Sequence, residues 1–304
     1  MTRRRWLATV IVVLAMVLAG CNGHAAGRLT MTPVDDAALA DRASYELDAT
    51  DPFETMEAAM IREAIEDGST TRNASRPFVR AERPFEYEGA YYNVSSEVVG
   101  QVQGYAGGVQ IDYNTSAADG EAIAYEDLPA VDQRQLAPLF EGQYRDDGEG
   151  FDIAIPVSYT RAEATQSVVV PEQEYDVVVY EGNSYRIATD DVRERPLDTY
   201  RYEATKVADS DRELATHLTD RYAFTLSGLS SDERDVVEAA LDDTYRAESS
   251  DDEPFGRVVE QFRAHEAVRQ DSYSGEWVVV YDGQRYWADL EYGGFITESG
   301  PSVT

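Results

Sequence analysis

Tyr281-Asp282-Gly283-Gln284-Arg285-Tyr286 is one of three copies of a six-residue pattern in this 304-residue chain: Tyr, an acid, Gly, two variable residues and Tyr. The other copies span residues 87–92 and 180–185, at spacings of 93 and 101 residues. Chance would give about 0.02 copies in a chain of this composition, so the pattern indicates an internal repeat. The fixed positions of this motif are Tyr87, Gly89, Tyr92, Tyr180, Gly182, Tyr185, Tyr281, Gly283 and Tyr286.

The motif predicts a β-hairpin. Residues 277–281 are β-branched or aromatic and run into an Asp-Gly pair, which favours a two-residue turn of type I′. With Asp-Gly as the loop, Tyr281 pairs with Gln284 and Val279 pairs with Tyr286. We therefore interpret the motif tyrosines as cross-strand packing residues of a scaffold, in preference to ligand-binding residues.

A second repeated string predicts a helix in each repeat. Residues 128–133 and 229–234 match at an offset of 101 residues, and Ser230 with Glu233 forms a capping box. Apolar residues follow both strings at helical spacing. A short strand is expected before each helix, as at 122–125.

These elements predict an α+β fold of three tandem repeats, each an antiparallel β-sheet with one helix in the order strand-helix-strand-hairpin-strand. This order resembles small cystatin-like modules at the level of fold alone. The final strands are expected at 109–113 and 198–207. The third unit is expected to carry an extra helix at 255–268, where the second has strands at 151–157 and 168–170.

The chain therefore divides into six expected segments. They are 1–20 (signal peptide), 21–44 (lipidated tether), 45–117 (first repeat unit), 118–208 (second repeat unit), 209–292 (third repeat unit) and 293–304 (tail).

The N-terminus carries an export signal. Three arginines precede an apolar run over 6–19, which is short for a membrane-spanning helix. Residues 2–7 (TRRRWL) resemble the twin-arginine export motif, and residues 18–21 (LAGC) resemble a lipobox, whose cysteine is lipidated. Cys21 is the only cysteine, so we expect a lipid on Cys21 to hold the protein at the extracellular face of the cytoplasmic membrane. An uncleaved signal anchor is the alternative.

The composition is strongly acidic. The chain has 58 acidic and 26 basic residues, a net charge of −32, and Lys206 is its only lysine. Without the three signal arginines, 23 basic residues remain against 58 acidic ones, a net charge of −35. This balance excludes nucleic acid as a main partner, and the missing Gly-Lys string excludes a P-loop.

The twin-arginine string, the lipobox and the use of Arg in place of Lys together resemble the exported lipobox lipoproteins of haloarchaeal cell surfaces. The resemblance is specific over residues 1–21 and compositional beyond them. It implies a location and a salt-rich environment, and it implies no activity. The acidity is then explained by the environment, without a basic partner.

Catalytic signatures are missing from the sequence. It contains neither His-Glu-x-x-His nor Gly-x-Ser-x-Gly, and its three histidines, His24, His217 and His265, fall in different segments. We interpret them as solvated or packed residues, and we expect no cofactor and no catalytic site. One loop has the close-spaced carboxylates of a calcium site, without the ligand alternation of a calcium hand. Its members are Asp146, Asp147, Glu149 and Asp152.

Three glycosylation sequons begin at Asn73, Asn93 and Asn114, all in the first repeat unit. Surface export makes them acceptor candidates. Asn93 ranks last because it follows a predicted strand.

These observations predict a non-enzymatic lipoprotein with three binding or structural modules. Its partner would be the membrane, through Cys21, and an envelope protein or polysaccharide; the oligomeric state stays open. The alternative is a secreted hydrolase that uses Asp or Glu on an extracellular polymer, which would need two carboxyls about 5–10 Å apart. A substrate-binding lipoprotein of a transporter is a third option, but the expected alternating α/β lobes are missing.

The charge predicts a salt requirement. Repulsion within a chain of net charge −35 is screened over about 3 Å at 1 M salt and about 30 Å at 0.01 M. The melting temperature, followed by circular dichroism, should fall steadily as KCl is reduced from 3 M to 0.05 M. An unchanged melting temperature would contradict this expectation.

Overall fold

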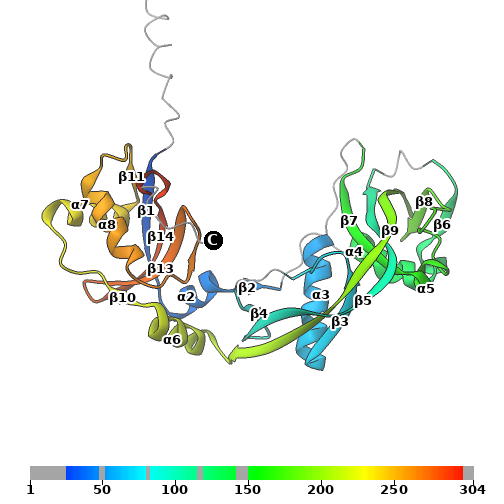
Figure 1. The fold of residues 1–304 in the computed structure, drawn as a ribbon, viewed down its shortest axis with the longest axis horizontal. Coiled ribbons are helices and arrows are strands. Elements are labelled where there is room, and N and C mark those ends of the chain that lie inside the picture. Colours follow the sequence, from blue (N-terminus) through cyan, green and yellow to red (C-terminus); the bar gives the residue numbers. More distant parts are fainter. Residues whose placement is uncertain (1–24, 48–51, 80–82, 115–118, 142–149, 297–304) are drawn as a thin grey trace, which may run out of the picture. The chain divides into compact units, whose positions relative to one another are not determined.

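The computed structural model describes residues 25–47, 52–79, 83–114, 119–141 and 150–296 (Figure 1). Within them, helices pack on two largely antiparallel sheets, so the fold class is α+β, as predicted. The chain divides into two lobes. The first lobe is Met1–Leu39 with Ala215–Thr304, and the second lobe is Ala40–Leu214.

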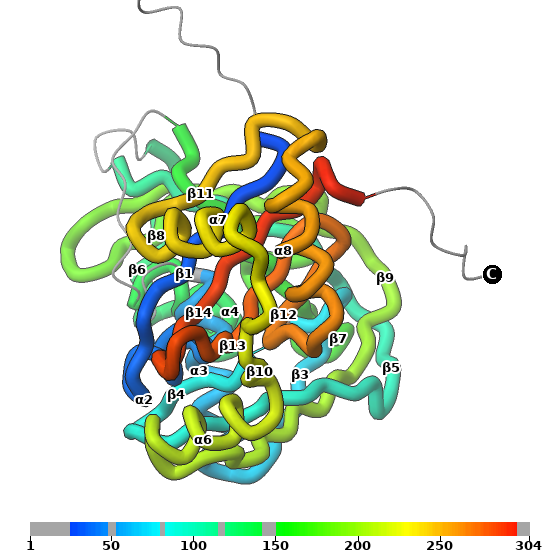
Figure 2. The backbone as a smooth tube through the Cα atoms, turned by 90° about the vertical axis from the view of Figure 1, so that its left-hand side faces the viewer, coloured from blue at the N-terminus to red at the C-terminus, as the bar shows by residue number. Residues whose placement is uncertain are grey.

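In the first lobe, five strands form a sheet in the order β10–β13–β14–β1–β11, and β12 also pairs with β13. The strands are β1 (Gly27–Pro33), β10 (Phe224–Thr225), β11 (Thr244–Ala247), β12 (Arg269–Gln270), β13 (Ser274–Tyr281) and β14 (Gln284–Glu291). Helices α7 (Ser231–Asp242) and α8 (Glu253–Arg263) cover one face of this sheet (Figure 2). Phe262, Trp277 and Leu290 lie in the core between the two layers. The lobe boundary falls within α2 (Asp36–Ala43) and α6 (Asp211–Tyr222).

In the second lobe, β5 and β9 form a long antiparallel ribbon (Figure 1). The strands of the second lobe are β2 (Tyr45–Glu46), β3 (Ser69–Ala74), β4 (Phe85–Tyr87), β5 (Ala90–Asp112), β6 (Ala122–Ala124), β7 (Ile153–Thr160), β8 (Val177–Tyr180) and β9 (Asn183–Ala208). Its helices are α3 (Pro52–Asp67), η2 (Tyr125–Asp127), α4 (Ala130–Glu141) and α5 (Arg161–Ala164). Each end of the ribbon has its own apolar core, one with Ile61 of α3 and one with Leu136 of α4.

All three motifs form hairpin turns, as predicted. Both loop residues have positive φ, as a type I′ turn requires. The angles are 51° and 76° at residues 88–89, 51° and 80° at 181–182, and 48° and 77° at 282–283. In the third hairpin Tyr281 pairs with Gln284 and Val279 with Tyr286, which is the predicted register.

Each hairpin has the same neighbours in the same order. The first strand of the hairpin pairs in parallel with a short strand that precedes the helix. The second strand of the hairpin pairs antiparallel with a strand from elsewhere in the chain. That strand pairs antiparallel in turn with the strand that follows the helix. The orders are β2–β4–β5–β9–β3, β6–β8–β9–β5–β7 and β10–β13–β14–β1–β11. The register agrees as well, because the last residue of each short strand lies opposite the residue before the motif tyrosine. These pairs are Glu46 with Glu86, Ala124 with Val179, and Thr225 with Val280.

The expected final strands do not complete their own units, which corrects the prediction of self-contained sheets for 45–117 and 118–208. The predicted strand at 109–113 is the far end of β5 and pairs with the second hairpin, whereas 198–207 is the far end of β9 and pairs with the first. The reason is that β5 and β9, the second strands of the first two hairpins, do not end within their own units. Each stays extended and paired along the ribbon until it enters the sheet at the other end.

Glycine allows the strands of the ribbon to approach one another closely where β7 joins it. A Cβ on Gly104 would lie 2.2 Å from the carbonyl oxygen of Tyr159, and a Cβ on Gly107 would lie 2.6 Å from Cα of Val192. Neither glycine has a positive φ, so they serve packing rather than a turn.

The expected tether at 21–44 is wrong for its described part. Residues 27–33 form β1 in the middle of the first-lobe sheet, where Leu29 and Met31 are buried. The partners of β1 come from residues 244–247 and 286–291. Leu29, Thr30, Met31 and Thr32 alternate between apolar and polar, the pattern of a half-buried strand, and the tether prediction overlooked this short alternation. Residues 1–24, including Cys21, lie outside the described residues.

The remaining expectations are met in part. The capping box of Ser230 and Glu233 starts α7, and the extra helix of the third unit is α8. Residues 153–160 form a strand, but 168–170 do not. In the expected tail, residues 293–295 form the short helix η3, with Phe295 packed on the first-lobe core, and 297–304 lie outside the described residues.

The hairpin turn makes a sharp prediction. At Gly283, φ is +77° and a Cβ would meet no atom within 4 Å, so any cost of a side chain comes from the backbone conformation alone. Gly283→Val should lower stability by about 1–3 kcal/mol, because a β-branched residue is strained at positive φ. Gln284→Val, one position along on β14, should cost little. Urea midpoints compare the two variants, and equal midpoints would contradict the turn assignment.

Candidate functional site

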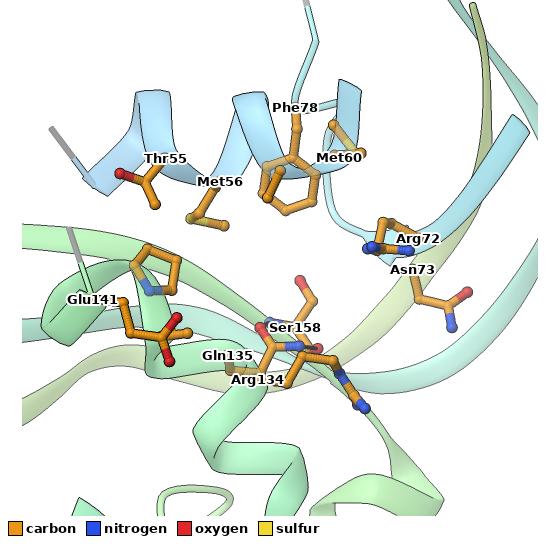
Figure 3. Close-up of a pocket in the computed structure, with 13 residues that line it drawn as sticks. Thr55, Met56, Met60, Arg72, Asn73, Phe78, Arg134, Gln135, Glu141 and Ser158 are labelled. Carbon is orange, nitrogen blue, oxygen red and sulfur yellow. Dashed lines mark hydrogen bonds between the residues drawn. The ribbon is translucent and has the colours of Figure 1, made fainter. Parts of the chain in front are cut away.

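A pocket of about 240 Å³ lies between α3 and α4 in the second lobe (Figure 3). Its walls are the two helices, and its floor is formed by β3 and β7, the strands that follow them. The lining residues are Thr55, Met56, Ala59, Met60, Arg72, Asn73, Phe78, Arg134, Gln135, Ala137, Pro138, Glu141 and Ser158. Each end of the ribbon therefore contributes a helix and the strand that follows it to one cavity.

The apolar part of the lining joins the two cores of the second lobe. Met60 belongs to the core beside α3, with Phe78 packed against it, and Met56 packs against the core beside α4. Pro138 lies inside α4 and has no N–H, so the carbonyl of Arg134, four residues earlier, loses its helical donor.

Two side chains of the floor are held by neighbouring groups. Gln135 Nε2 donates to the backbone carbonyl of Ser158 at 2.8 Å, and Gln135 Oε1 accepts from the backbone N–H of Ser158 at 3.4 Å. These two bonds hold α4 on β7. Arg72 pairs with Glu63 and donates to Thr70 Oγ1 at 2.8 Å. The hydrogen bond from Arg72 lowers the pKa of the Glu63 carboxyl, against a smaller opposing effect of burial.

The charges of the lining are inverted relative to the chain. Arg72 and Arg134 stand against one acid, Glu141, whereas the whole chain has 58 acidic and 26 basic residues. Arg134 donates from Nη2 to Glu163 at 2.6 Å, and Glu163 lies outside the lining. Figure 3 shows both arginines on one side of the cavity and Glu141 on the other. The pocket is thus polarised, with an apolar middle.

A buried carboxylate beside α4 has a structural role. Asp132 is fully buried and accepts from the Ser167 hydroxyl at 2.6 Å and from the Val168 amide at 2.8 Å. Ser167 Oγ accepts in turn from the amides of Val169 and Val170. These bonds explain why 168–170 is not a strand: its amides bind side chains. Burial, reinforced by nearby Asp132, raises the pKa of the Tyr159 phenol.

The calcium candidate stays a prediction. Asp146, Asp147 and Glu149 lie outside the described residues, and Asp152 accepts from the Tyr113 amide at 2.7 Å. Among the residues that the structure describes, no cluster of three or more metal-ligating side chains occurs.

Four of the motif tyrosines contact a helix, a neighbouring ring or the core, and their scaffold role stays a prediction. Tyr87 donates to Glu66 of α3 at 3.2 Å, Tyr180 packs edge-on against Tyr125 at 5.2 Å, and Tyr281 is buried in the core with α7. Tyr185 contacts Phe140 of α4 at 6.1 Å.

The sequons differ in access. Asn93 is exposed on β5, so the reason for ranking it last is wrong. Asn73 is half-buried, lines the pocket and accepts from Thr199 at 2.7 Å, and Asn114 is half-buried as well. Glycan attachment itself stays a prediction.

The two described histidines lie apart from the pocket. His265 stacks on Phe224 with ring centroids 4.1 Å apart, which fits the interpretation as a packed residue, and His217 lies on α6.

The sequence analysis missed the pocket. Its members come from residues 55 to 158 and share no motif; only Pro138, an unusual residue within a predicted helix, marks one wall.

Comparisons with known proteins give no relative: no family model, no curated protein and no solved structure matches this chain. Within the described part of the chain, no helix combines the length and apolarity needed to cross a bilayer. We therefore infer function from the chain's own residues.

The Glu63–Arg72 pair predicts a pH dependence. A carboxyl with a lowered pKa in the folded state contributes stability above its unfolded pKa and loses it as pH falls through the folded value. Glu63→Gln should therefore lower the free energy of unfolding at pH 7, by about 0.5 kcal/mol for a pair that water reaches, and with it the urea midpoint. The difference from wild type should shrink as the pH is lowered from 7 to 3.

Glu260→Gln is the control, since Glu260 is an exposed carboxylate on a different helix. It should leave the midpoint unchanged at both pH values. A Glu63→Gln effect that persists undiminished at pH 3 would contradict the ionic origin.

Proposed function

We propose that this chain is a lipid-anchored protein of a haloarchaeal cell surface, whose three α+β modules bind or organise envelope components without catalysing a reaction. Each module consists of a short strand, a helix, the strand after it and a hairpin, completed by one strand from elsewhere in the chain. The sets are β2, α3, β3 and β4–β5; β6, α4, β7 and β8–β9; and β10, α7, β11 and β13–β14.

The observation that carries this proposal is the common pairing of the three hairpins. All three share strand order, strand direction, turn conformation and the register of the short strand. Such agreement over separate stretches of sequence supports three copies of one module. In the second and third modules, the completing strand, β5 or β1, precedes the module in the chain.

The polar groups do not repeat with the scaffold. Asp132 is buried in the second module and Glu233 in the third, and each is already bound within its module. Glu233 accepts from the Ser230 amide at 2.9 Å and from Arg257 at 2.5 Å, and these bonds, the amide's first, lower the pKa of its carboxyl. Repetition of a framework without repetition of a reactive set favours binding or structural modules over an enzyme.

A hydrolase based on Asp or Glu is less well supported. Glycoside hydrolysis requires two carboxyl groups on opposite sides of the scissile bond. The pocket between α3 and α4 is lined by one carboxylate, Glu141, whose Oε1 accepts from Tyr125 at 3.2 Å.

Membrane attachment is supported by the lipobox around Cys21 and by the acidic composition. A negative charge of this size keeps the protein soluble at high salt, so a covalent lipid is the simplest means of retention at the surface. The twin-arginine string supports export in a folded state.

In a haloarchaeal host, a labelled glycerolipid precursor should label the wild type, and Cys21→Ser should be released into the medium. The reason is that the lipid is the proposed sole attachment. Cell fractionation with immunoblotting measures both. Retention of unprocessed Cys21→Ser in the membrane at equal yield would support the signal-anchor alternative.

A matched pair of variants tests the route. Changing Arg3 and Arg4 to Lys should block export, whereas Arg28→Lys, on β1 beyond the signal, should leave export intact. Export that survives the double change would contradict the twin-arginine route.

A further inference from the structure

We propose that the pocket between α3 and α4 binds a small amphipathic carboxylate, with its apolar body between the helices and its carboxylate on the side of Arg134. This inference deepens the proposed binding role and rests on it, but it does not depend on the lipid anchor. The cavity is enclosed by residues of the second lobe alone.

Charge is the first argument. Two guanidinium groups reach one small cavity in a chain with 26 basic residues against 58 acidic ones, and the lining contains a single acid. Both arginines also pair with acids outside the lining, Arg72 with Glu63 and Arg134 with Glu163, so this balance describes only the groups that line the cavity. An anionic group of a ligand complements the side of Arg72 and Arg134, and Glu141 disfavours it at the opposite side (Figure 3).

Available donors are the second argument. A guanidinium has five N–H donors, and Arg134 places one nitrogen, Nη2, on Glu163. Asn73 also lines the cavity, and its carbonyl oxygen accepts from Thr199. Hydrogen bonds from charged donors to a carboxylate are roughly twice as strong as neutral ones.

The apolar middle is the third argument. Met56, Met60 and Phe78 face Ala137 and Pro138 across the cavity, and Met56 and Phe78 are only half-buried. Methionine adapts to the shape of an apolar ligand and makes favourable contacts with aromatic rings. An aryl or alkyl chain would cover these side chains from water.

Size limits the ligand. The volume of about 240 Å³ lies just below the range of about 300–1,000 Å³ that is typical of drug-sized ligands. A molecule of about a dozen non-hydrogen atoms with one charged end therefore fits the cavity.

The probes are 4-phenylbutyrate, 4-phenylbutan-1-ol and 4-phenylbutylamine, which share one body and differ in the end group. Each is titrated into the full-length chain in molar KCl, with saturation-transfer NMR and calorimetry as readouts. The carboxylate should bind about tenfold tighter than the alcohol, since one charged hydrogen bond is lost, and the amine should bind weakest. Equal affinity for the carboxylate and the alcohol, or no binding of any probe, would overturn the proposal.

Variants locate the binding. Arg134→Gln should remove the preference for the carboxylate and leave the affinity for the alcohol unchanged. Arg193→Gln is the matched control, because Arg193 is also exposed and also pairs with an acid, Asp191 at 2.6 Å, away from the cavity lining. Loss of the preference in both variants would overturn the proposal, since it would indicate a general charge effect.

A filled cavity completes the test. Ala137→Trp should abolish binding of the carboxylate and the alcohol alike, with far-UV circular dichroism verifying the fold. If that variant does not fold, Ala59→Phe fills the cavity from the exposed side of α3 instead. Binding retained in a folded cavity-filling variant would overturn the proposal, and surface attachment through Cys21 would be unaffected by that result.

Discussion

The antiparallel pairing of β5 with β9 is the constraint on which the second lobe depends. Each strand leaves its own hairpin and enters the sheet at the other end, so neither sheet is complete without the other's strand. We therefore expect the two cores to unfold together, because breaking the ribbon would expose both. The close approach at Gly104 and Gly107 permits this geometry.

The same exchange positions the pocket. Helices α3 and α4 pack on the two different cores of the second lobe, and the strands that follow them supply the floor of the pocket. A self-contained module would present its helix to solvent, whereas the paired arrangement encloses a cavity between two helices. The first lobe is completed differently. Its sheet takes β1 as the fourth strand, and a second helix, α8, packs beside α7.

The acidic composition limits how ion pairs can stabilise this protein. Buried carboxylates in the described residues are satisfied individually: Asp112 by Arg186 at 3.0 Å, and Asp132 by hydroxyl and amide donors. Most other pairs lie at the surface, where each contributes little. We therefore expect the excess acids to influence solubility and salt dependence more than the fold.

The amino-acid sequence determined much of the local structure of this protein. Turn chemistry is decided by neighbouring residues, so Glu-Gly and Asp-Gly within β-rich runs predicted three hairpins with the correct register at Tyr281. The capping box at Ser230 and the amphipathic spacing predicted the helices for the same reason. Export and anchoring stay predictions from residues 1–21, which lie outside the described residues.

Only the tertiary structure decided which strands complete which sheet and where a pocket forms. Strand pairing joins residues up to about 260 positions apart, as for β1 and β14, and no local pattern specifies that partner. The tether and the self-contained repeats were therefore wrong, although the motif was right. The pocket lining converges from four elements and a loop, each with an ordinary local role. Its charge and shape exist only once β5 and β9 have brought α3 and α4 together.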